Sequence, residues 1–359
     1  MALYVGLDVS LKTISICIVE ADGTLLWEGK AESEPVPLFK ALSRWQTRIA
    51  LVGIEACPLS EWLYGALVES GLHAVCIETR HAQRFLSSRP NKTDRSDARG
   101  IADMMRLGHF RAVHVKSKES QLLRTTLIAR RKFVDHMLAI EDTIRGLLRV
   151  HGLKVGLIHR VRFAPRVEAL LADAPSLRVA IEPLLEARNM MRRHKALLDR
   201  RLSQMARKDD ICKRLMTVSG VGPIVSLSFK ATIDDPKRFK DSKAVAAHLG
   251  LTPRVYQSGE IDRSGNISKC GDKLMRHALY EAANSHLRIS KKWSVVRAWG
   301  VKLAKRIGAK KAYVAVARKL AIIMHRMWLD GADFRFGQPP AVQAGYGAPT
   351  FTPITGPGL

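Results

Sequence analysis

Long apolar runs and a secretion signal are both missing from this sequence of 359 residues. The opening, MALYVGLDVS, has no basic segment followed by an apolar one, and no later apolar run approaches the length that crosses a bilayer. Cysteine is sparse: the five cysteines are scattered, without a CxxC pair or a histidine pair at zinc-ligand spacing. We therefore expect a cytoplasmic protein with reduced thiols and no structural zinc site.

Acidic residues are in deficit as well. The chain has 33 Asp and Glu against 59 Lys and Arg, which leaves a net charge of +26. Self-repulsion of this size is most naturally neutralised by a polyanion, and nucleic acid is the commonest one. A ribosomal or membrane-surface protein could show the same balance, so the charge predicts a class of partner and no chemistry. The length predicts two or three domains.

The first third of the sequence has the pattern of an α/β domain. Asp22 and Gly23 form a hairpin turn between two strand-like segments, and later strands alternate with helices, which predicts that the last strands run parallel to the first. The expected strands are 3–8, 14–20, 24–27, 49–55 and 73–78, and the expected helices are 37–45 and 59–70. A basic, turn-rich link, 79–92, precedes a further helix that begins at the N-cap Thr93 and stops at Gly108.

The middle of the chain, from about 117 to 208, is long, charged and helical. Helices are expected at 122–150 and from 177 onward, separated by the Gly/Pro-bearing segment 152–175. A four-three alternation predicts a coiled-coil seam, interrupted by Arg188 and Lys195. Its positions are Leu177, Ile181, Leu184, Arg188, Met191, Lys195, Leu198, Leu202 and Met205. The two helices suggest an arm or hairpin for self-association, and the alternative is one amphipathic helix on a globular body.

The third region, about 211–332, opens with LMTVSGVGPIVSLSF, which resembles a helix-hairpin-helix turn. Backbone amides near Gly220 and Gly222 could meet a phosphate there, although a plain tight turn fits equally well. The stretch 251–283 is turn-rich and then helical. A strongly basic helical segment follows, and its cations are Lys291, Lys292, Arg297, Lys302, Lys305, Arg306, Lys310 and Lys311. The Gly-, Pro- and Ala-rich end predicts a disordered tail over 336–359.

Four carboxylates indicate a metal site. Asp8 and Glu55 end two predicted strands, and Asp94 and Asp97 are three apart on a predicted helix, so both can face one point. Gathered at one sheet edge, they would repel each other unless a cation lay among them, and hard oxygen ligands select Mg²⁺ or Mn²⁺. Two such ions can assist phosphodiester chemistry. Singly, each carboxylate has an ordinary explanation as a strand end, loop cap or helix terminus.

Six segments of the chain carry a resemblance: GLDVSLK (6–12), IEA (54–56), NKTDRSDA (91–98), SGVGP (219–223), AAHLGLTPRVYQSG (246–259) and GNISKCGDKLMRHALYEAA (265–283). They resemble a known family, the DEDD transposases of insertion sequence 110. One departure follows Glu55, where the family usually has Ala-Thr-Gly and an aromatic residue and this chain has Ala56-Cys57-Pro58.

The resemblance implies an RNase H-like, Holliday-junction-resolvase-like catalytic domain over 1–112, a coiled-coil oligomerisation region over 113–210 and a mostly α transposase domain over 211–335. It implies that Asp8, Glu55, Asp94 and Asp97 bind Mg²⁺ or Mn²⁺ and that Ser258 attacks DNA to form a transient phosphoserine link. It further implies a prokaryotic, nucleoid-associated homo-oligomer, dimer or tetramer, in which a non-coding bridge RNA pairs with target and donor DNA. Arg254, Lys269, Lys291 and Lys292, with Gly220 and Gly222, are candidate nucleic-acid contacts.

Two other functions remain open at this point. A resolvase-like nuclease would use the same carboxylates to activate water and would need no serine. A non-catalytic nucleic-acid-binding protein would need only the basic helices. A proofreading exonuclease is disfavoured, because that class typically has Asp-x-Glu on its first strand, and here Asp8 is followed by Val9 and Ser10.

Overall fold

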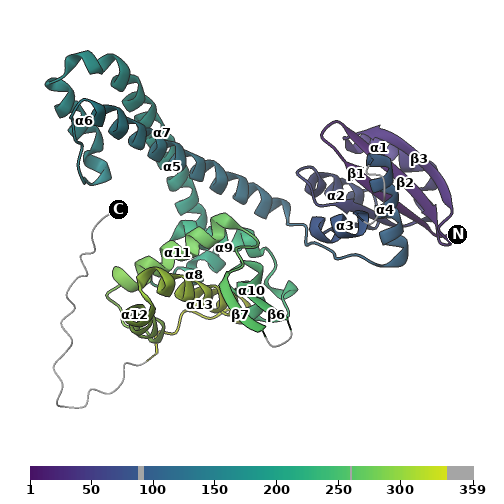
Figure 1. The fold of residues 1–359 in the computed structure, drawn as a ribbon. Coiled ribbons are helices and arrows are strands. Elements are labelled where there is room, and N and C mark those ends of the chain that lie inside the picture. The colour runs from purple at the N-terminus through teal and green to yellow at the C-terminus, as the bar shows by residue number, and fades with distance from the viewer. Residues whose placement is uncertain (88–92, 259–260, 338–359) are drawn as a thin grey trace. The chain divides into compact units, whose positions relative to one another are not determined.

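The computed structural model describes residues 1–87, 93–258 and 261–337 (Figure 1). The chain divides into two compact units, Met1–Ser117 and Lys118–Leu359. The predicted first domain ends at residue 112, and the residues just after this position also belong to the first unit. The Val113 amide donates a hydrogen bond to the Cys76 carbonyl, and Val115 packs on the core of that unit. No helix in the described ranges is both long and apolar enough to span a membrane.

The first unit is built on a five-stranded mixed sheet with the order β3-β2-β1-β4-β5. Its strands are β1 (Leu3–Val9), β2 (Thr13–Glu20), β3 (Leu25–Glu32), β4 (Ile49–Glu55) and β5 (Ala74–Ile77). The first three form an antiparallel meander, and β4 and β5 run parallel to β1. The predicted meander and the predicted parallel strands are thus confirmed.

Helices cover both faces of this sheet, which explains why its central strands are buried on both sides. Leu7, Ile16 and Ile54 belong to one core, which includes residues of α1 (Pro35–Leu42) and α2 (Ser60–Glu69). Cys17 and Val19 point to the opposite face and pack against α4 (Asp94–Leu107). Hydrophobic residues alternate between the two faces because successive strand side chains point in opposite directions.

Two predicted segments of the first unit differ in the structure. The helix expected at 37–45 begins earlier, with Pro35 in its first turn, and gives way at Ser43 to a 3-10 helix (Ser43–Arg48). Proline suits a first helical turn because its missing amide has no partner there anyway. The link expected at 79–92 contains helix α3 (Thr79–Leu86), in which Ala82 is buried against the sheet. Residues 88–92 of that link lie outside the described residues.

The second unit begins with a pair of long antiparallel helices. They are α5 (Lys118–Val150) and α7 (Arg178–Lys208), and between them lie two 3-10 turns (Arg160–Arg162, Pro175–Leu177) and α6 (Phe163–Ala172). Leu123 near the start of α5 packs with Leu202 near the end of α7, and Ile144 packs with Ile181 at the opposite end. Figure 1 shows α6 at this second end of the pair. The segment read as a simple break, 152–175, therefore contains a helix, with Pro165 in its first turn.

A buried ion pair lies inside this helical pair. Arg188, which seemed to interrupt the apolar seam, is only 1% exposed, and its Nη2 atom lies 2.7 Å from Glu141 Oε1. The same guanidinium donates to the Arg160 carbonyl at 3.0 Å and lies over the ring of Phe163. The seam expected from the four-three alternation thus contains a charge at Arg188, and a partner on α5 neutralises this charge.

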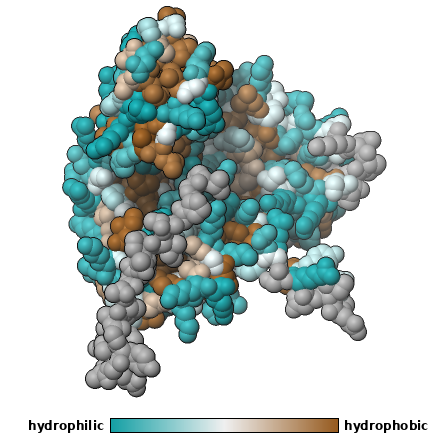
Figure 2. Space-filling model, turned by 60° about the vertical axis from the view of Figure 1, so that its left-hand side comes forward, coloured by the Kyte–Doolittle hydropathy of each residue, from teal (hydrophilic) through white to brown (hydrophobic). Residues whose placement is uncertain are grey.

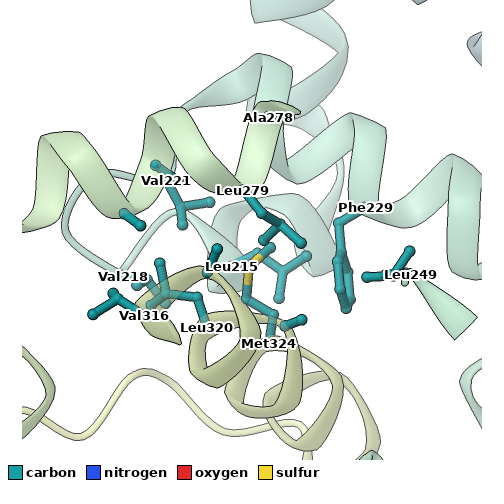
Figure 3. Packing of buried hydrophobic residues seen from close by; sticks show 14 of the residues in the cluster. Leu215, Val218, Val221, Phe229, Leu249, Ala278, Leu279, Val316, Leu320 and Met324 are labelled. Carbon is teal, nitrogen blue, oxygen red and sulfur yellow. The ribbon is translucent and has the colours of Figure 1, made fainter. Parts of the chain in front are cut away.

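The remainder of the second unit is a helical domain with one small hairpin. Its elements are α8 (Asp210–Leu215), α9 (Pro223–Ile233), a 3-10 turn (Pro236–Arg238), α10 (Ser242–His248), β6 (Pro253–Ser258), β7 (Ile261–Ile267), α11 (Lys273–Arg288), α12 (Val295–Ile307) and α13 (Ala309–Asp330). Leu279 of α11 and Leu320 and Met324 of α13 converge with Val218 and Phe229 in its core (Figure 3). Hydrophilic residues spread over the face shown in Figure 2, with apolar patches between them.

Two segments of this domain differ from the expectation, one in its middle and one at its end. The turn-rich stretch after Leu251 forms the antiparallel hairpin β6–β7. At the C-terminal end of the domain, the expected tail starts at 336, yet Phe336 packs edge-on against Phe334, and its carbonyl accepts a hydrogen bond from the Val295 amide. The rest of the expected tail, 338–359, lies outside the described residues.

Replacing Arg188 by leucine leaves the buried Glu141 carboxylate with only a longer contact to the exposed Arg160, at 3.8 Å. We expect the free energy of unfolding to fall by about 3–5 kcal/mol, and the double variant Arg188→Leu with Glu141→Leu to recover most of that loss. Arg131→Gln, which breaks the exposed pair with Asp135, should cost under about 1 kcal/mol. Urea unfolding followed by circular dichroism measures all three, and equal losses in Arg188→Leu and Arg131→Gln would contradict the assignment.

Candidate active site

Asp8 and Glu55 are neighbouring residues at one edge of the sheet, where the parallel strands β1 and β4 end. Leu7 of β1 is paired with Ile54 of β4, so the next residue on each strand is level with the other. Adjacent strands are about 4.8 Å apart. Because Leu7 and Ile54 face the core beneath α1 and α2, Asp8 and Glu55 point to the opposite face of the sheet.

Helix α4 crosses that opposite face in direct contact with the two strands. A Cβ atom on Gly6 would lie 2.1 Å from the Ala98 carbonyl oxygen and 2.3 Å from the Ala102 amide nitrogen. A Cβ on Gly53 would lie 2.7 Å from the Met105 side chain. Asp8 thus lies two residues after Gly6, and Glu55 lies two residues after Gly53. Both glycines let α4 approach the sheet.

The helix runs from the edge with the carboxylates toward the opposite edge. Arg106, near its end, lies against Gly23 in the β2–β3 turn, which is at the far edge. The first turn of α4 therefore lies where β1 and β4 end. The Thr93 hydroxyl caps this turn by accepting a hydrogen bond from the Ser96 amide at 3.1 Å, and Gly108 ends the helix with a φ of 64°. Both predicted helix boundaries are confirmed.

Asp94 and Asp97 both belong to that first turn, so all four predicted carboxylates share one edge of the first unit. Asp94 is exposed, and the other three are half-buried. Across the described ranges, no group of three or more His, Cys, Asp or Glu side chains is gathered tightly enough to hold a metal ion. The residue types and their shared edge fit a divalent cation, and their spacing is wider than a closed coordination shell.

The loop after Glu55 is held by its own hydrogen bonds. The Cys57 amide donates to the Ser60 hydroxyl at 3.1 Å, and this hydroxyl donates to the Cys57 carbonyl at 2.8 Å. The Ala56 amide donates to the Ile77 carbonyl, which ties the loop to β5. Pro58 lies just before α2 rather than in its first turn, and the loop brings the chain from Glu55 to α2 without the Thr-Gly sequence usual in the family.

Ser258, the candidate nucleophile, is the last residue of β6 and is exposed. It pairs with Ile261 of β7. It belongs to the unit Lys118–Leu359, whereas the four carboxylates belong to Met1–Ser117. The thiols of Cys17 and Cys212 are disfavoured as nucleophiles, because burial raises the pKa of both to about 12 and so keeps them protonated.

The predicted helix-hairpin-helix turn consists of α8, a short turn and α9. Gly220 has a φ of 89°, and a Cβ there would lie 2.5 Å from the Ala282 carbonyl oxygen, so this glycine seats the turn on α11. The Ser219 carbonyl accepts a hydrogen bond from His286 Nδ1 at 2.7 Å, and burial lowers the pKa of this histidine. Gly222 is the N-cap residue of α9 and faces open space.

The other candidate nucleic-acid contacts are exposed cations of the second unit. Arg254 on β6 donates to the Ser268 carbonyl at 3.2 Å, and Lys269 follows β7 with a φ of 55°. Lys291 and Lys292 lie just before α12, and the ammonium of Lys292 is 5.5 Å from the ring centroid of Phe336. Their exposure is compatible with phosphate contacts, which stay a prediction.

Comparison with known proteins decides the family. A model described as a transposase, for the DEDD transposases related to insertion sequence IS110, matches residues 5–152, and a model described as "Transposase IS116/IS110/IS902 family" matches residues 212–296. Together they match more than half of the chain. The chain belongs to the IS110 family of transposases. The first match contains all four carboxylates, and the second contains Ser258 and the Gly220 turn.

Full-length relatives agree with this IS110-family membership. The transposase for insertion sequence element IS1111A of Coxiella burnetii is 27% identical over 92% of this chain and 91% of its own length. A probable family 20 transposase of Pseudomonas aeruginosa is 29% identical over 76% of this chain and 82% of its own.

The structure of RuvC from Thermus thermophilus covers 31% of this chain and 99% of its own, at 14% identity and a TM-score of 0.25.

The contact at Gly6 predicts which substitution disrupts the carboxylate edge. In Gly6→Ala the new methyl group meets backbone atoms of α4, so the helix must move away from the sheet. We expect a loss of about 1–3 kcal/mol or more in unfolding free energy. Gly65→Ala in α2, where nothing lies within 4 Å, should be neutral or stabilising by up to about 1 kcal/mol. Thermal unfolding tests this pair, and a neutral Gly6→Ala would refute the close approach.

Proposed function

We propose that this IS110-family transposase cuts and rejoins DNA strands with a divalent cation held by Asp8, Glu55, Asp94 and Asp97 and with Ser258 as nucleophile. The observation that carries the proposal is the placement of the four carboxylates. They come from two adjacent strands and the first turn of α4, and all lie at one edge of the first unit. An arrangement drawn from three elements is hard to attribute to strand ends and helix capping alone.

The proposed chemistry is transesterification. A bound Mg²⁺ or Mn²⁺ would lower the proton affinity of the attacking oxygen and offset charge on the leaving one. The Ser258 oxygen attacks phosphorus, the bond from phosphorus to the neighbouring sugar oxygen breaks, and that sugar hydroxyl departs with the proton. Because one phosphoester bond replaces another, the strand is rejoined by the reverse attack. An unassisted serine hydroxyl is a poor nucleophile, so Ser258 has to approach the carboxylates.

Assembly is part of the proposal, because the carboxylates and Ser258 belong to different units. We propose that a homo-oligomer, dimer or tetramer, brings the carboxylates of one subunit to Ser258 of another. The antiparallel α5–α7 pair supports a role in this assembly, as the coiled-coil region does in the resemblance. It carries exposed apolar side chains along its length, among them Leu122, Leu147 and Leu197.

A bridge RNA is the proposed source of sequence specificity. The net charge of +26 suits a protein that holds several nucleic-acid strands at once. Arg254, Lys269, Lys291 and Lys292, with the amides near Gly220 and Gly222, are the proposed contacts to phosphates. The target and donor sequences would then be set by base pairing to the RNA.

A second candidate function is a resolvase-like nuclease that uses activated water. The division of the chain favours it in one respect, since all four carboxylates lie in the unit Met1–Ser117 and water needs no residue of the other unit. Its products would be hydrolysed ends without a protein–DNA link.

Cation binding tests the carboxylate site without requiring activity. Saturating Mn²⁺ should raise the melting temperature, because a ligand present at 100 times its Kd stabilises the folded state by about 2.7 kcal/mol. Asp8→Asn should lose this shift, and Glu61→Gln, which alters an exposed carboxylate of α2, should keep it. Differential scanning fluorimetry with and without Mn²⁺ measures the shift. An unchanged Mn²⁺ response in Asp8→Asn would rule out this site.

Covalent trapping tests the serine. With Mg²⁺ and DNA that carries an end of the insertion sequence, the wild-type chain should form a detergent-stable protein–DNA adduct, and Ser258→Ala should form none. Tyr256→Phe removes the other exposed hydroxyl of β6, on the same side of the strand, and should leave the adduct intact. Adduct formation by Ser258→Ala would exclude the serine, and hydrolysed ends without any adduct would favour the nuclease.

A further inference from the structure

A pocket of about 440 Å³ lies beside the base of the β6–β7 hairpin. This volume is within the range of about 300–1,000 Å³ typical of small-molecule sites. Pro253 and Ile267, which are paired at the base of the hairpin, form one side of it. Leu251, Val314 and Ile322 add apolar surface from the helical core. The pocket therefore offers an apolar floor on which a flat, uncharged group can rest.

The rim of this pocket is strongly basic. Lys243 of α10 and Lys311, Arg318 and Lys319 of α13 line it, and no carboxylate does. Among the described residues, none of these four cations forms a salt bridge with an aspartate or glutamate. Four cations around an apolar floor are complementary to a ligand that joins a flat apolar part to an anion.

The aromatic residue of the pocket is Trp299 of α12, which is 37% exposed. Its neighbour Gly300 lets α12 approach closely, since a Cβ there would lie 2.7 Å from both Leu287 and Val316. Trp299 precedes Gly300 in α12, and its side chain lies at the surface. The ammonium of Lys319 lies 4.5 Å from its ring centroid.

Trp299 also borders a second basic hollow. This hollow has a volume of about 510 Å³, and its cations are Lys302, Lys305 and Arg306 of α12. One exposed indole thus separates two groups of cations, with no acidic residue in either lining. Single-stranded nucleic acids are bound in this way, by bases stacked on aromatic rings between phosphate-binding cations.

We propose that Trp299 and the pocket beside it bind an unpaired base of the DNA strand that is being cut, with the flanking phosphates held by the cations of the two hollows. This inference rests on the proposed function, because we assign the bound strand as DNA on the ground that Ser258 is the proposed nucleophile toward DNA. The pocket includes Pro253, the first residue of β6, and Ser258 is the last. Five residue steps along a strand span about 16 Å, so the stacked base lies within a few nucleotides of the cut phosphate.

Equilibrium binding tests the pocket apart from chemistry. The full-length chain is titrated without Mg²⁺ into a short fluorescein-labelled single-stranded DNA, the same sequence as a duplex, and the same sequence as RNA, with anisotropy as the readout. Trp299→Ala should weaken binding of the single-stranded DNA at least about fivefold and leave duplex binding unchanged. Trp299→Phe should restore most of the affinity, because phenylalanine keeps a stacking surface. Trp62→Ala, at an exposed tryptophan of α2, should change nothing.

The cations have a separate readout in the salt dependence. Lys319→Gln should reduce the slope of log affinity against log salt by about 0.7, the value for one phosphate contact on a single strand. Arg326→Gln, on the same helix but paired with Asp330, should leave the slope unchanged. Equal weakening of single strand and duplex by Trp299→Ala, or no weakening, would overturn the pocket, and weakening of RNA alone would overturn the assignment to DNA. The adduct assay on Ser258 fails or succeeds independently of these titrations.

Discussion

The contact between Gly6 and the backbone of α4 is the constraint on which the candidate site depends. The helix can bring Asp94 and Asp97 to the ends of β1 and β4 only if it lies directly on the strands, and a side chain at Gly6 would keep it away. Gly53 serves the same purpose one strand over. The placement of the four carboxylates therefore depends on glycine at positions 6 and 53, which have no side chain, and on the N-cap Thr93, which fixes where α4 starts.

Much of the first unit could be predicted from the sequence because its signals are local. The hairpin turn at Asp22-Gly23, the cap at Thr93 and the stop at Gly108 each determine a boundary through their own backbone chemistry. The alternation of strands and helices implied that the later strands run parallel to the first, and the shared edge of Asp8 and Glu55 required in addition that β1 and β4 be neighbours, which the structure shows. The distances between the four carboxylates did not follow from the sequence, because register and helix start place the backbone, whereas the side-chain rotamers place the carboxylate groups.

The errors concern elements stabilised by distant partners. Every residue of β6 is exposed, so the strand has no apolar alternation to reveal it. Helix α3 buries only Ala82 and otherwise looks like a polar link. Arg188 looked like a flaw in an apolar seam because its partner, Glu141, lies 47 residues away in sequence. A charge buried in a helical pair loses its hydration, and the carboxylate and carbonyl that take the place of water cannot be recognised from the sequence neighbours of Arg188.

The division of the chain into two units has a consequence for the safety of the host. The Ser258 hydroxyl on β6 and the acids on β1, β4 and α4 belong to different units, so in the proposed serine mechanism neither unit by itself carries every reacting group. Under that proposal a freshly made polypeptide cuts no DNA until assembly brings the two kinds of group together. The proposed reaction is then limited by geometry rather than by the amount of enzyme.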